Sequence, residues 1–337
     1  KNLWVTSGHW EKFRENMYFT EIDEQEYAVK PMNCPGGLLI YKDGRHSYRE
    51  LPIRNAELGL VHRHEKSGVL HGLFRVRAFT QDDAHSFCTP EQLNDEIINM
   101  VDFAMDIYST FGFNEYTIYI ATRPEKYIGS DQDWEMATSA LKNALEQKGL
   151  DYKIKEGEGA FYGPKIEFNI KDCIGRDWQC GTIQVDYSMP GRFGAVYIDN
   201  NNQEKTPVMV HRAILGSLER FLGILIEHYA GAFPVWLSPT QIQLTPVSAK
   251  HVDGAKQLAK DLLLIHELRV DVDEADETVG NKVRKAAQKK IPYIIVIGDR
   301  ELAGGEWTIR VRGQEEQVKI GKDEFVEKIK REIKTRK

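Results

Sequence analysis

Charged and aromatic side chains alternate along two neighbouring segments, residues 61–65 and 73–85. A glycine-containing turn over residues 66–72 joins them, which predicts a β-hairpin. Because side chains two residues apart share a face of a strand, one face is expected to carry Arg63, Glu65, Arg75, Arg77, Phe79, Gln81 and Asp83. Arginine forks suit phosphate and an aromatic ring can stack on a base, so this face could bind a nucleotide. The alternative is a solvated hairpin whose opposite charges pair across the strands.

A metal site is a second possible chemistry. Cys34 lies in a turn-prone segment, His85 ends the returning hairpin strand, and His211 is expected to open an apolar helix. One thiolate and two imidazoles would leave a fourth tetrahedral position open, as in catalytic zinc sites. Spacing does not select these residues, since they lie 51 and 126 positions apart and His85-x-x-Cys88 is an equally good pair. For each of them, a buried structural side chain is the alternative.

The segment from His211 to Leu222 is predicted to be a buried helix, because its apolar residues occupy most of the helical circumference. Glu219 and Arg220 within it then need partners or a ligand. The small residues Gly216 and Ser217 one turn earlier would let a ligand approach the backbone. The alternative for Arg220 is an ion pair with a structural carboxylate.

The elements that must position these residues divide the chain into two patterns. Upstream, strands over 115–121, 152–155, 166–170 and 178–187 are separated by only two clear helices, 90–111 and 133–148, which favours an antiparallel sheet flanked by helices, an α+β layout. From residue 241 onward strands and helices alternate, which predicts a small α/β domain with a largely parallel sheet. A proline-rich break near Pro234 places the domains at 1–235 and 236–337.

Length, composition and charge exclude several classes. A chain of 337 residues that is 41% hydrophobic is too long for one ordinary domain and too apolar for a disordered protein. Its apolar runs are far shorter than the roughly 18 residues of a membrane span. Four cysteines are too few for a disulfide scaffold, so a reducing compartment such as the cytoplasm is expected. The net charge of −6 argues against nucleic acid, although residues 236–337 carry 20 Lys and Arg against 17 Asp and Glu.

Two of these segments resemble motifs of one enzyme class. Arg63-His64-Glu65 with Arg75 resembles motif 2 of the class II aminoacyl-tRNA synthetases, and Gly216 to Arg220 resembles motif 3. Residues 32–36, 75–85, 162–165 and 178–184 resemble stretches of the threonyl enzymes, in the same order along the chain. The resemblance implies a class II catalytic domain followed by an anticodon-binding domain, with ATP-dependent activation of L-threonine and its transfer to tRNA(Thr).

The resemblance also implies how threonine is recognised. Cys34, His85 and His211 would be the ligands of one Zn²⁺ per chain, with Cys88 outside the coordination sphere. In the family, threonine binds this zinc through its amino group and its hydroxyl, which the isosteric valine cannot do. Asp83 would accept a hydrogen bond from the hydroxyl. The implied threonine contacts together are Met32, Arg63, Gln81, Asp83 and Tyr162.

Further roles follow from the resemblance. Arg63 and Arg220 would be catalytic at the phosphates of ATP, which binds with Mg²⁺. His9, Lys165 and Gln184 would assist transfer near the terminal adenosine of the tRNA. The implied ATP contacts are Arg63, Glu65, Arg75, Phe79, Gln179 and Arg220. The implied anticodon contacts are Arg284, Glu301 and Arg310, supported by a basic helix over 282–290 whose alternative is a solvated face.

The chain departs from the family in what it lacks. Motif 1, which builds the homodimer interface of the class, and an editing domain are expected upstream of Leu3, so the chain is predicted to be truncated at its N-terminus. One rival hypothesis is a catalytically idle synthetase-like paralogue that binds tRNA. The other is the prolyl enzyme, which shares the tail domain but needs no Cys-His-His zinc.

Overall fold

The computed structural model describes residues 1–336 and divides into two compact units. Unit 1 runs from Lys1 to Leu225 and unit 2 begins at Ile226, so the division falls inside helix α7 (Leu218–His228). The domain boundary predicted at residue 235 stays a prediction. No helix among residues 1–336 is long and apolar enough to cross a membrane.

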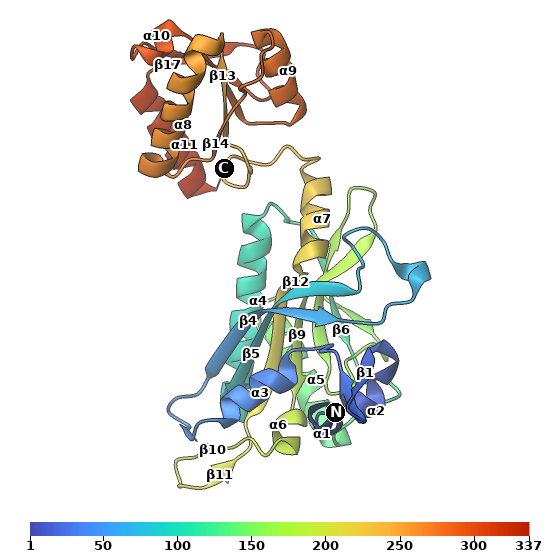
Figure 1. Cartoon of the computed structure of the whole chain (residues 1–337). Coiled ribbons are helices and arrows are strands. Elements are labelled where there is room, and N and C mark those ends of the chain that lie inside the picture. Colours follow the sequence, from blue (N-terminus) through green and yellow to red (C-terminus); the bar gives the residue numbers. More distant parts are fainter. Residues whose placement is uncertain (337) are drawn as a thin grey trace. The chain divides into compact units, whose positions relative to one another are not determined.

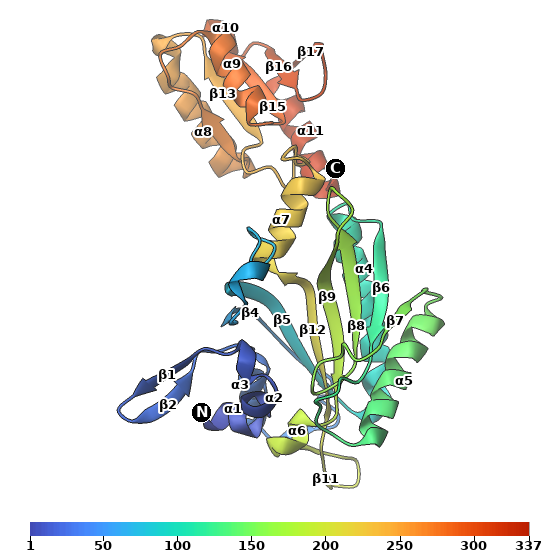
Figure 2. The same cartoon turned by 90° about the vertical axis from the view of Figure 1, so that its right-hand side faces the viewer.

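Unit 1 is built on a seven-stranded sheet in the order β4-β5-β12-β9-β8-β6-β7. Every neighbouring pair is antiparallel except β6 and β7, which confirms the predicted antiparallel layout. Figure 1 shows β4, β5, β12, β9 and β6 of this sheet, and Figure 2 shows all seven strands. Their bounds are β4 (Ile53–His62), β5 (Ala78–Cys88), β6 (Tyr116–Ala121), β7 (Lys153–Lys155), β8 (Lys165–Lys171), β9 (Asp177–Asp186) and β12 (Val208–Ser217).

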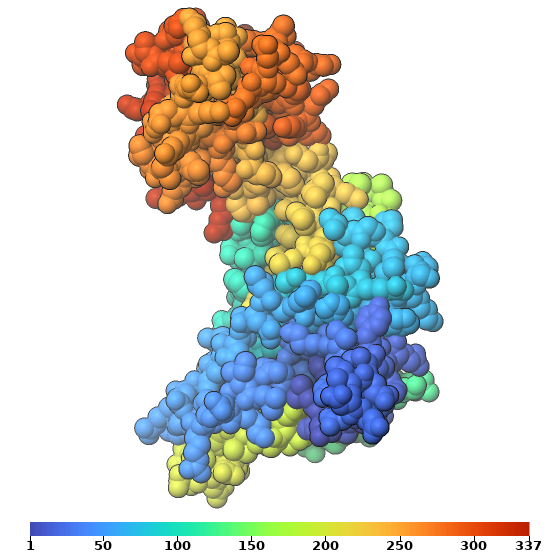
Figure 3. All heavy atoms as spheres, in the orientation of Figure 1, coloured from blue at the N-terminus to red at the C-terminus, as the bar shows by residue number. Residues whose placement is uncertain are grey.

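Helices α4 (Leu93–Thr110) and α5 (Asp131–Gln147) cover one face of this sheet (Figure 2). The N-terminal segment, dark blue in the space-filling view, lies at the surface of unit 1 (Figure 3). The remaining elements of unit 1 are short. They are α1 (Asn2–Thr6), α2 (His9–Lys12), β1 (Phe19–Ile22), β2 (Gln25–Ala28), α3 (Cys34–Lys42), β3 (His46–Ser47), α6 (Met189–Arg192), β10 (Tyr197–Ile198), β11 (Glu204–Lys205) and 3₁₀ turns at Arg14–Asn16, Ser67–Val69 and Pro90–Gln92.

The prediction of a helix from His211 to Leu222 is wrong for its first half. Residues Val208–Ser217 form β12, which lies between β5 and β9 in the middle of the sheet. A strand buried on both faces has a continuous apolar run that periodicity cannot distinguish from a buried helix. Gly216 adopts a φ of +78° near the end of this strand, and α7 begins at Leu218.

The predicted hairpin is confirmed as the antiparallel pair of β4 and β5, but its strands are displaced. The returning strand begins at Ala78 and not at residue 73, because residues 67–69 form a 3₁₀ turn and His71 bridges back to Arg75. Arg75 and Arg77 therefore lie in the connecting loop. Arg77 is exposed and donates its Nε to the Glu65 carbonyl at 2.9 Å, so it leaves the functional face.

Unit 2 has a five-stranded sheet in the order β14-β13-β15-β16-β17. Pairs β14-β13 and β13-β15 are parallel, whereas β15-β16 and β16-β17 are antiparallel, so the prediction of a largely parallel sheet is correct for half of it. The bounds are β13 (Ile242–Pro246), α8 (Val252–His266), β14 (Val270–Val272), α9 (Val279–Gln288), β15 (Tyr293–Ile297), α10 (Asp299–Leu302), β16 (Trp307–Val311), β17 (Gln317–Ile320), α11 (Lys322–Thr335) and a 3₁₀ turn at Ala249–His251.

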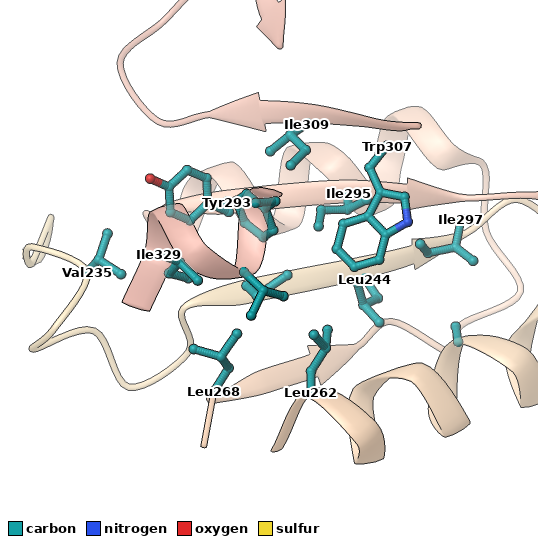
Figure 4. Packing of buried hydrophobic residues seen from close by; sticks show 14 residues of the cluster. Val235, Leu244, Leu262, Leu268, Tyr293, Ile295, Ile297, Trp307, Ile309 and Ile329 are labelled. Carbon is teal, nitrogen blue, oxygen red and sulfur yellow. The ribbon is translucent and has the colours of Figure 1, made fainter. Parts of the chain in front are cut away.

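The larger hydrophobic cluster of unit 2 lies on one face of this sheet (Figure 4), and a smaller cluster forms around Ala286, Ile291 and Ile294. Ile242 and Leu244 from the interior strand β13 are fully buried there, and Trp307 is 1% exposed. Helix α11 contributes Phe325, whose ring contacts that of Tyr293 edge to face at 5.0 Å. Burial of such aliphatic and aromatic side chains stabilises this unit by about 1.5–3 kcal/mol for each one.

Candidate active site

A cavity of about 530 Å³ opens in unit 1 against the face of the sheet opposite α4. The side chains of strand β5 alternate between the two faces of the sheet. Ser86 donates a hydrogen bond to Glu96 of α4 on one face, whereas Gln81, Asp83 and His85 line the cavity on the other face. Every site residue predicted in this unit lines the cavity except His9. They are Met32, Cys34, Arg63, Glu65, Arg75, Phe79, Gln81, Asp83, His85, Tyr162, Lys165, Gln179, Gln184, His211 and Arg220.

Three potential metal ligands meet in the wall of this cavity. The ligand atoms of Cys34, His85 and His211 lie within 4.8 Å of one another, and all three residues are buried. His85 and His211 are direct partners in the β5–β12 register, and Cys34 begins α3. Tetrahedral zinc with bonds of about 2.0–2.3 Å needs ligand atoms roughly 3.3–3.8 Å apart, so this group fits the ion after a small contraction.

The alternative pair, His85 with Cys88, is not brought together. Three positions along a strand place two side chains on opposite faces, and within residues 1–336 only the trio above forms a group of three or more residues that could hold a metal ion. Burial lowers the pKa of His85 to about 4, which keeps its imidazole in the neutral form that binds metals.

Asp186 orients His211, a function that the sequence analysis missed. The Asp186 Oδ2 atom lies 3.2 Å from His211 Nε2, while Oδ1 accepts hydrogen bonds from the backbone amides of Ser188 and Met189 at 2.7 and 2.8 Å. Asp186 is fully buried. With Nε2 held by this carboxylate, Nδ1 is the His211 nitrogen left for a metal ion, as in carboxylate–histidine–metal arrangements.

Next to the trio stand the polar groups predicted to recognise threonine. Asp83 Oδ2 accepts a hydrogen bond from Asn33 at 2.9 Å, and its Oδ1 lies 3.6 Å from His85 Nε2. The Tyr162 hydroxyl donates to Gln184 Oε1 at 2.6 Å. The wall beside the metal ligands therefore carries a fixed carboxylate and a phenol, which can bind an amino group or a hydroxyl.

Arginines also line the cavity wall. Arg63 donates its Nε to the Pro31 carbonyl at 3.1 Å and lies over the Phe79 ring at 5.1 Å. Arg75 Nε is 3.4 Å from a Glu65 carboxylate oxygen. Burial lowers the pKa of Arg63 below its usual value, yet an arginine stays charged in proteins. The arrangement can bind phosphates beside an aromatic ring.

Arg220 is held by carbonyl groups and not by a carboxylate. Its Nε donates to the Phe74 carbonyl at 2.7 Å and Nη1 to the Gln179 carbonyl at 2.8 Å, and the guanidinium lies 5.4 Å from the Trp178 ring. Within residues 1–336 it has no ion pair, so the predicted alternative of a structural carboxylate is wrong. Its positive charge therefore remains available to an anionic ligand in the cavity.

Two further acidic residues position α7. Asp82 accepts hydrogen bonds from the backbone amides of residues 214, 215 and 216 at 2.8–3.1 Å, which fixes the irregular end of β12. Glu219 accepts from the Thr80 amide at 3.0 Å. The sequence signal for Asp82 was its position between Gln81 and Asp83, which directs its side chain away from the cavity face.

Comparison with known proteins identifies the family. The model of the tRNA synthetase class II core domain (G, H, P, S and T) matches residues 18–229, and that of the anticodon binding domain matches residues 241–332. The chain is 54% identical over its whole length to a threonine–tRNA ligase of Carboxydothermus hydrogenoformans, of which it covers 53%. The chain belongs to the threonyl-tRNA synthetase family. It spans about half the length of the curated relatives that it matches.

Solved structures agree with this family. The RNA binding domain of threonyl-tRNA synthetase from Cryptosporidium parvum superposes with a TM-score of 0.92 at 41% identity, over 97% of this chain and 82% of that one. A prolyl-tRNA synthetase from Giardia lamblia superposes with a TM-score of 0.70 at 17% identity. The match covers 100% of this chain and 68% of the prolyl enzyme. That second likeness shows the fold alone. The predicted catalytic fold of a class II synthetase followed by an anticodon-binding domain is therefore confirmed.

The structure places His9 behind the cavity wall of this threonyl-tRNA synthetase family member. Its Nδ1 lies 2.8 Å from Ser7 Oγ and its Nε2 lies 2.9 Å from the sulfur of Met32, which lines the cavity. Burial, with the charges of His211 and Arg63, lowers its pKa to about 3, so the ring is neutral. The transfer function of His9 stays a prediction.

Lys165 lines the cavity and forms an ion pair with the buried carboxylate of Glu167. Its Nζ lies 2.7 Å from Glu167 Oε1, while Lys155 donates to Glu167 Oε2 at 2.7 Å. Glu167 is 2% exposed, so one buried carboxylate fixes two ammonium groups. Lys165 and Gln184 are direct partners in the β8–β9 register and therefore lie on the same part of the wall.

The predicted anticodon contacts all belong to unit 2. Glu301 accepts from the Gly298 amide at 3.0 Å and so caps its own short helix, and Arg284 donates to Asn281 Oδ1 at 2.7 Å. Arg310 is exposed on β16. The basic helix offers fewer free charges to a nucleic acid than predicted, because Lys282 is 3% exposed and donates a hydrogen bond to the Pro246 carbonyl.

Proposed function

We propose that this chain activates L-threonine with ATP and transfers it to tRNA(Thr). The observation that carries the proposal is that one cavity holds both a metal-binding trio and a set of arginines, in a member of the threonyl-tRNA synthetase family. The trio with Asp83 suits a small ligand that carries an amino group and a hydroxyl. The arginines with Phe79 suit the phosphates and base of a nucleotide.

Activation is an attack of the threonine carboxylate on the α-phosphate of ATP. A carboxylate oxygen forms a bond to phosphorus, the bond to the bridging oxygen breaks, and pyrophosphate leaves while threonyl-adenylate remains. Negative charge develops on the phosphoryl oxygens, so Arg63 at the α-phosphate and Arg75 with Arg220 at the γ-phosphate would stabilise the transition state. ATP would enter with Mg²⁺, and Glu65, Phe79 and Gln179 would hold its adenosine.

Threonine would be selected at the metal end of the cavity. Cys34, His85 and His211 would hold one Zn²⁺, which supplies Lewis-acid ligation of the amino and hydroxyl groups. Asp83 would accept a hydrogen bond from the hydroxyl, and Gln81, Met32 and Tyr162 would surround the amino group and side chain. A site built to bond a hydroxyl rejects an isostere without one far better than an apolar pocket can.

Transfer would follow when a ribose hydroxyl of the tRNA attacks the acyl carbon of the adenylate, releasing AMP. Lys165, Gln184 and His9 are proposed to act near the terminal adenosine. Unit 2 would bind the anticodon through Arg284, Glu301 and Arg310, and its match to the anticodon binding domain supports that assignment. Homodimer formation and a cytoplasmic location stay predictions.

Pyrophosphate exchange tests the proposal and its rivals. We expect threonine-dependent exchange by the purified chain, one zinc per chain by elemental analysis, and no exchange with valine or proline. Proline-dependent exchange would instead indicate the prolyl rival, which the 17% identity to a prolyl enzyme does not favour. A chain that binds tRNA without exchange for any amino acid would indicate the idle paralogue, and the proposal would be wrong.

A further inference from the structure

Asn33 is a buried polar residue to which the reaction outlined above gives no function. It is 1% exposed and lies directly before Cys34 at the start of α3. Within residues 1–336 its side chain makes a single hydrogen bond, from Nδ2 to Asp83 Oδ2 at 2.9 Å, and its Oδ1 has no partner. A buried amide with only one bond is costly, so that bond needs an explanation.

Helix capping does not explain this side chain. The Asn33 backbone carbonyl accepts the amides of Gly36 and Gly37 at 3.0 and 3.1 Å, but its side chain forms no capping bond to α3. An asparagine at this position usually bonds such an amide. The Asn33 side chain is instead directed toward Asp83, away from the helix it precedes.

The sheet holds the amide in that position. Gly59 lies on β4 directly opposite Gln81 of β5, so it is on the same face of the sheet as the cavity-lining residues of β5. A Cβ atom on Gly59 would lie 2.3 Å from Asn33 Nδ2 and 2.5 Å from its Cγ and Oδ1. Real Cβ atoms do not approach that closely, so a glycine is needed here for the amide to reach Asp83.

The consequence falls on Asp83. One of its oxygens is fixed by Asn33, and the other lies 3.6 Å from His85 Nε2 at the edge of the metal-binding trio. Without the amide, this carboxylate could rotate toward His85 and no longer face a ligand. The bond therefore sets the orientation in which Asp83 is presented to the cavity.

We propose that Asn33, seated against Gly59, is a positioning residue that orients Asp83 and thereby sets the discrimination between a hydroxyl and a methyl group on the amino acid. This inference rests on the proposed function, because it concerns the same amino-acid pocket. Threonine and valine differ by that one group, and only threonine can use the Asp83 carboxylate.

The test compares three variants of the zinc-loaded chain. Asn33→Ala removes the donor, and Gly59→Ala displaces the amide while its chemistry is kept. Gly36→Ala is the matched control, because a Cβ there meets nothing within 4 Å. The measurements are kcat/KM for threonine in pyrophosphate exchange, the inhibition constant of valine against threonine, and zinc content by elemental analysis.

We expect Asn33→Ala and Gly59→Ala each to lower kcat/KM for threonine by about tenfold to a hundredfold, the range of a hydrogen bond to a charged group. The valine inhibition constant and the zinc content should stay the same, and Gly36→Ala should match the unmodified chain. Equal weakening of threonine and valine, or loss of zinc, would show a merely structural role and overturn the inference. Absence of threonine-dependent exchange in the unmodified chain would instead refute the proposed function itself.

Discussion

Replacement of Asp186 by asparagine tests whether this carboxylate selects the metal-binding nitrogen of His211. Asparagine has the same shape, and its Oδ1 can still accept the amides of Ser188 and Met189. Its Nδ2 would replace the oxygen that lies 3.2 Å from His211 Nε2. An amide donor there favours the tautomer with the proton on Nδ1, which removes the lone pair needed by the metal.

The magnitude follows from this change of partner. Loss of a hydrogen-bonding partner behind a ligating histidine typically weakens metal binding by about 10–100-fold, which corresponds to about 1.4–2.7 kcal/mol. The two backbone bonds are kept, so the metal-free chain should unfold within about 1 kcal/mol of the parent. Zinc affinity is measured by chelator competition, and stability by urea unfolding in the presence of a chelator.

Asp199→Asn is the matched control for this substitution. Asp199 also accepts two backbone amides in a turn, at 2.8 Å each, but it has no histidine partner among residues 1–336. It should leave zinc affinity unchanged. If Asp186→Asn binds zinc within twofold of the parent, the tautomer reasoning is refuted. If it weakens zinc only because the metal-free chain has lost its fold, Asp186 has a structural function alone.

Three further changes probe other parts of the chain. Gly216→Ala should destabilise unit 1 by roughly 2–5 kcal/mol in urea unfolding, because φ is +78° and the new Cβ would lie 2.5 Å from the Cys180 carbonyl. Arg220→Lys should raise KM for ATP about tenfold in pyrophosphate exchange, since a lysine lacks the planar fork; an unchanged KM would contradict its assigned contact. Glu301→Ala should cost unit 2 about 1 kcal/mol by loss of the Gly298 cap, measured by thermal unfolding.

Much of the fold could be predicted from the sequence. In the tail, the alternation of strands and helices expected from residue 241 onward is present, for example in helix Val252–His266 and strand Tyr293–Ile297, because amphipathic and β-branched segments alternate there. Periodicity failed at Val208–Ser217, a central strand whose two buried faces carry no alternation. Whether this segment is a strand or a helix depends on its pairing with β5 and β9, which lie far away in the sequence and leave no local pattern.

Only part of the site could be predicted, because its residues are brought together by contacts between segments that lie far apart in the sequence. Cys34 and His211 were reached through the resemblance to a family and not through spacing, since they lie far apart in the sequence. Asn33, Asp82 and Asp186 act through hydrogen bonds to side chains or amides that lie at least 25 positions away in the sequence. No local pattern marks such residues, because their partners are brought near only by strand pairing.

Strand register is therefore the property on which this site depends. His85 and His211 are direct partners across β5 and β12, and Asp83 pairs with Ala213 on the same face. A slip of one residue would turn every side chain of β12 to the opposite face of the sheet, which would direct His211 toward α4 and Arg212 toward the metal site. Asp82 opposes such a slip, because its three backbone bonds hold the end of β12 at one position. The Asp82 carboxylate, which faces away from the cavity, thus keeps His211, a proposed metal ligand, in the cavity.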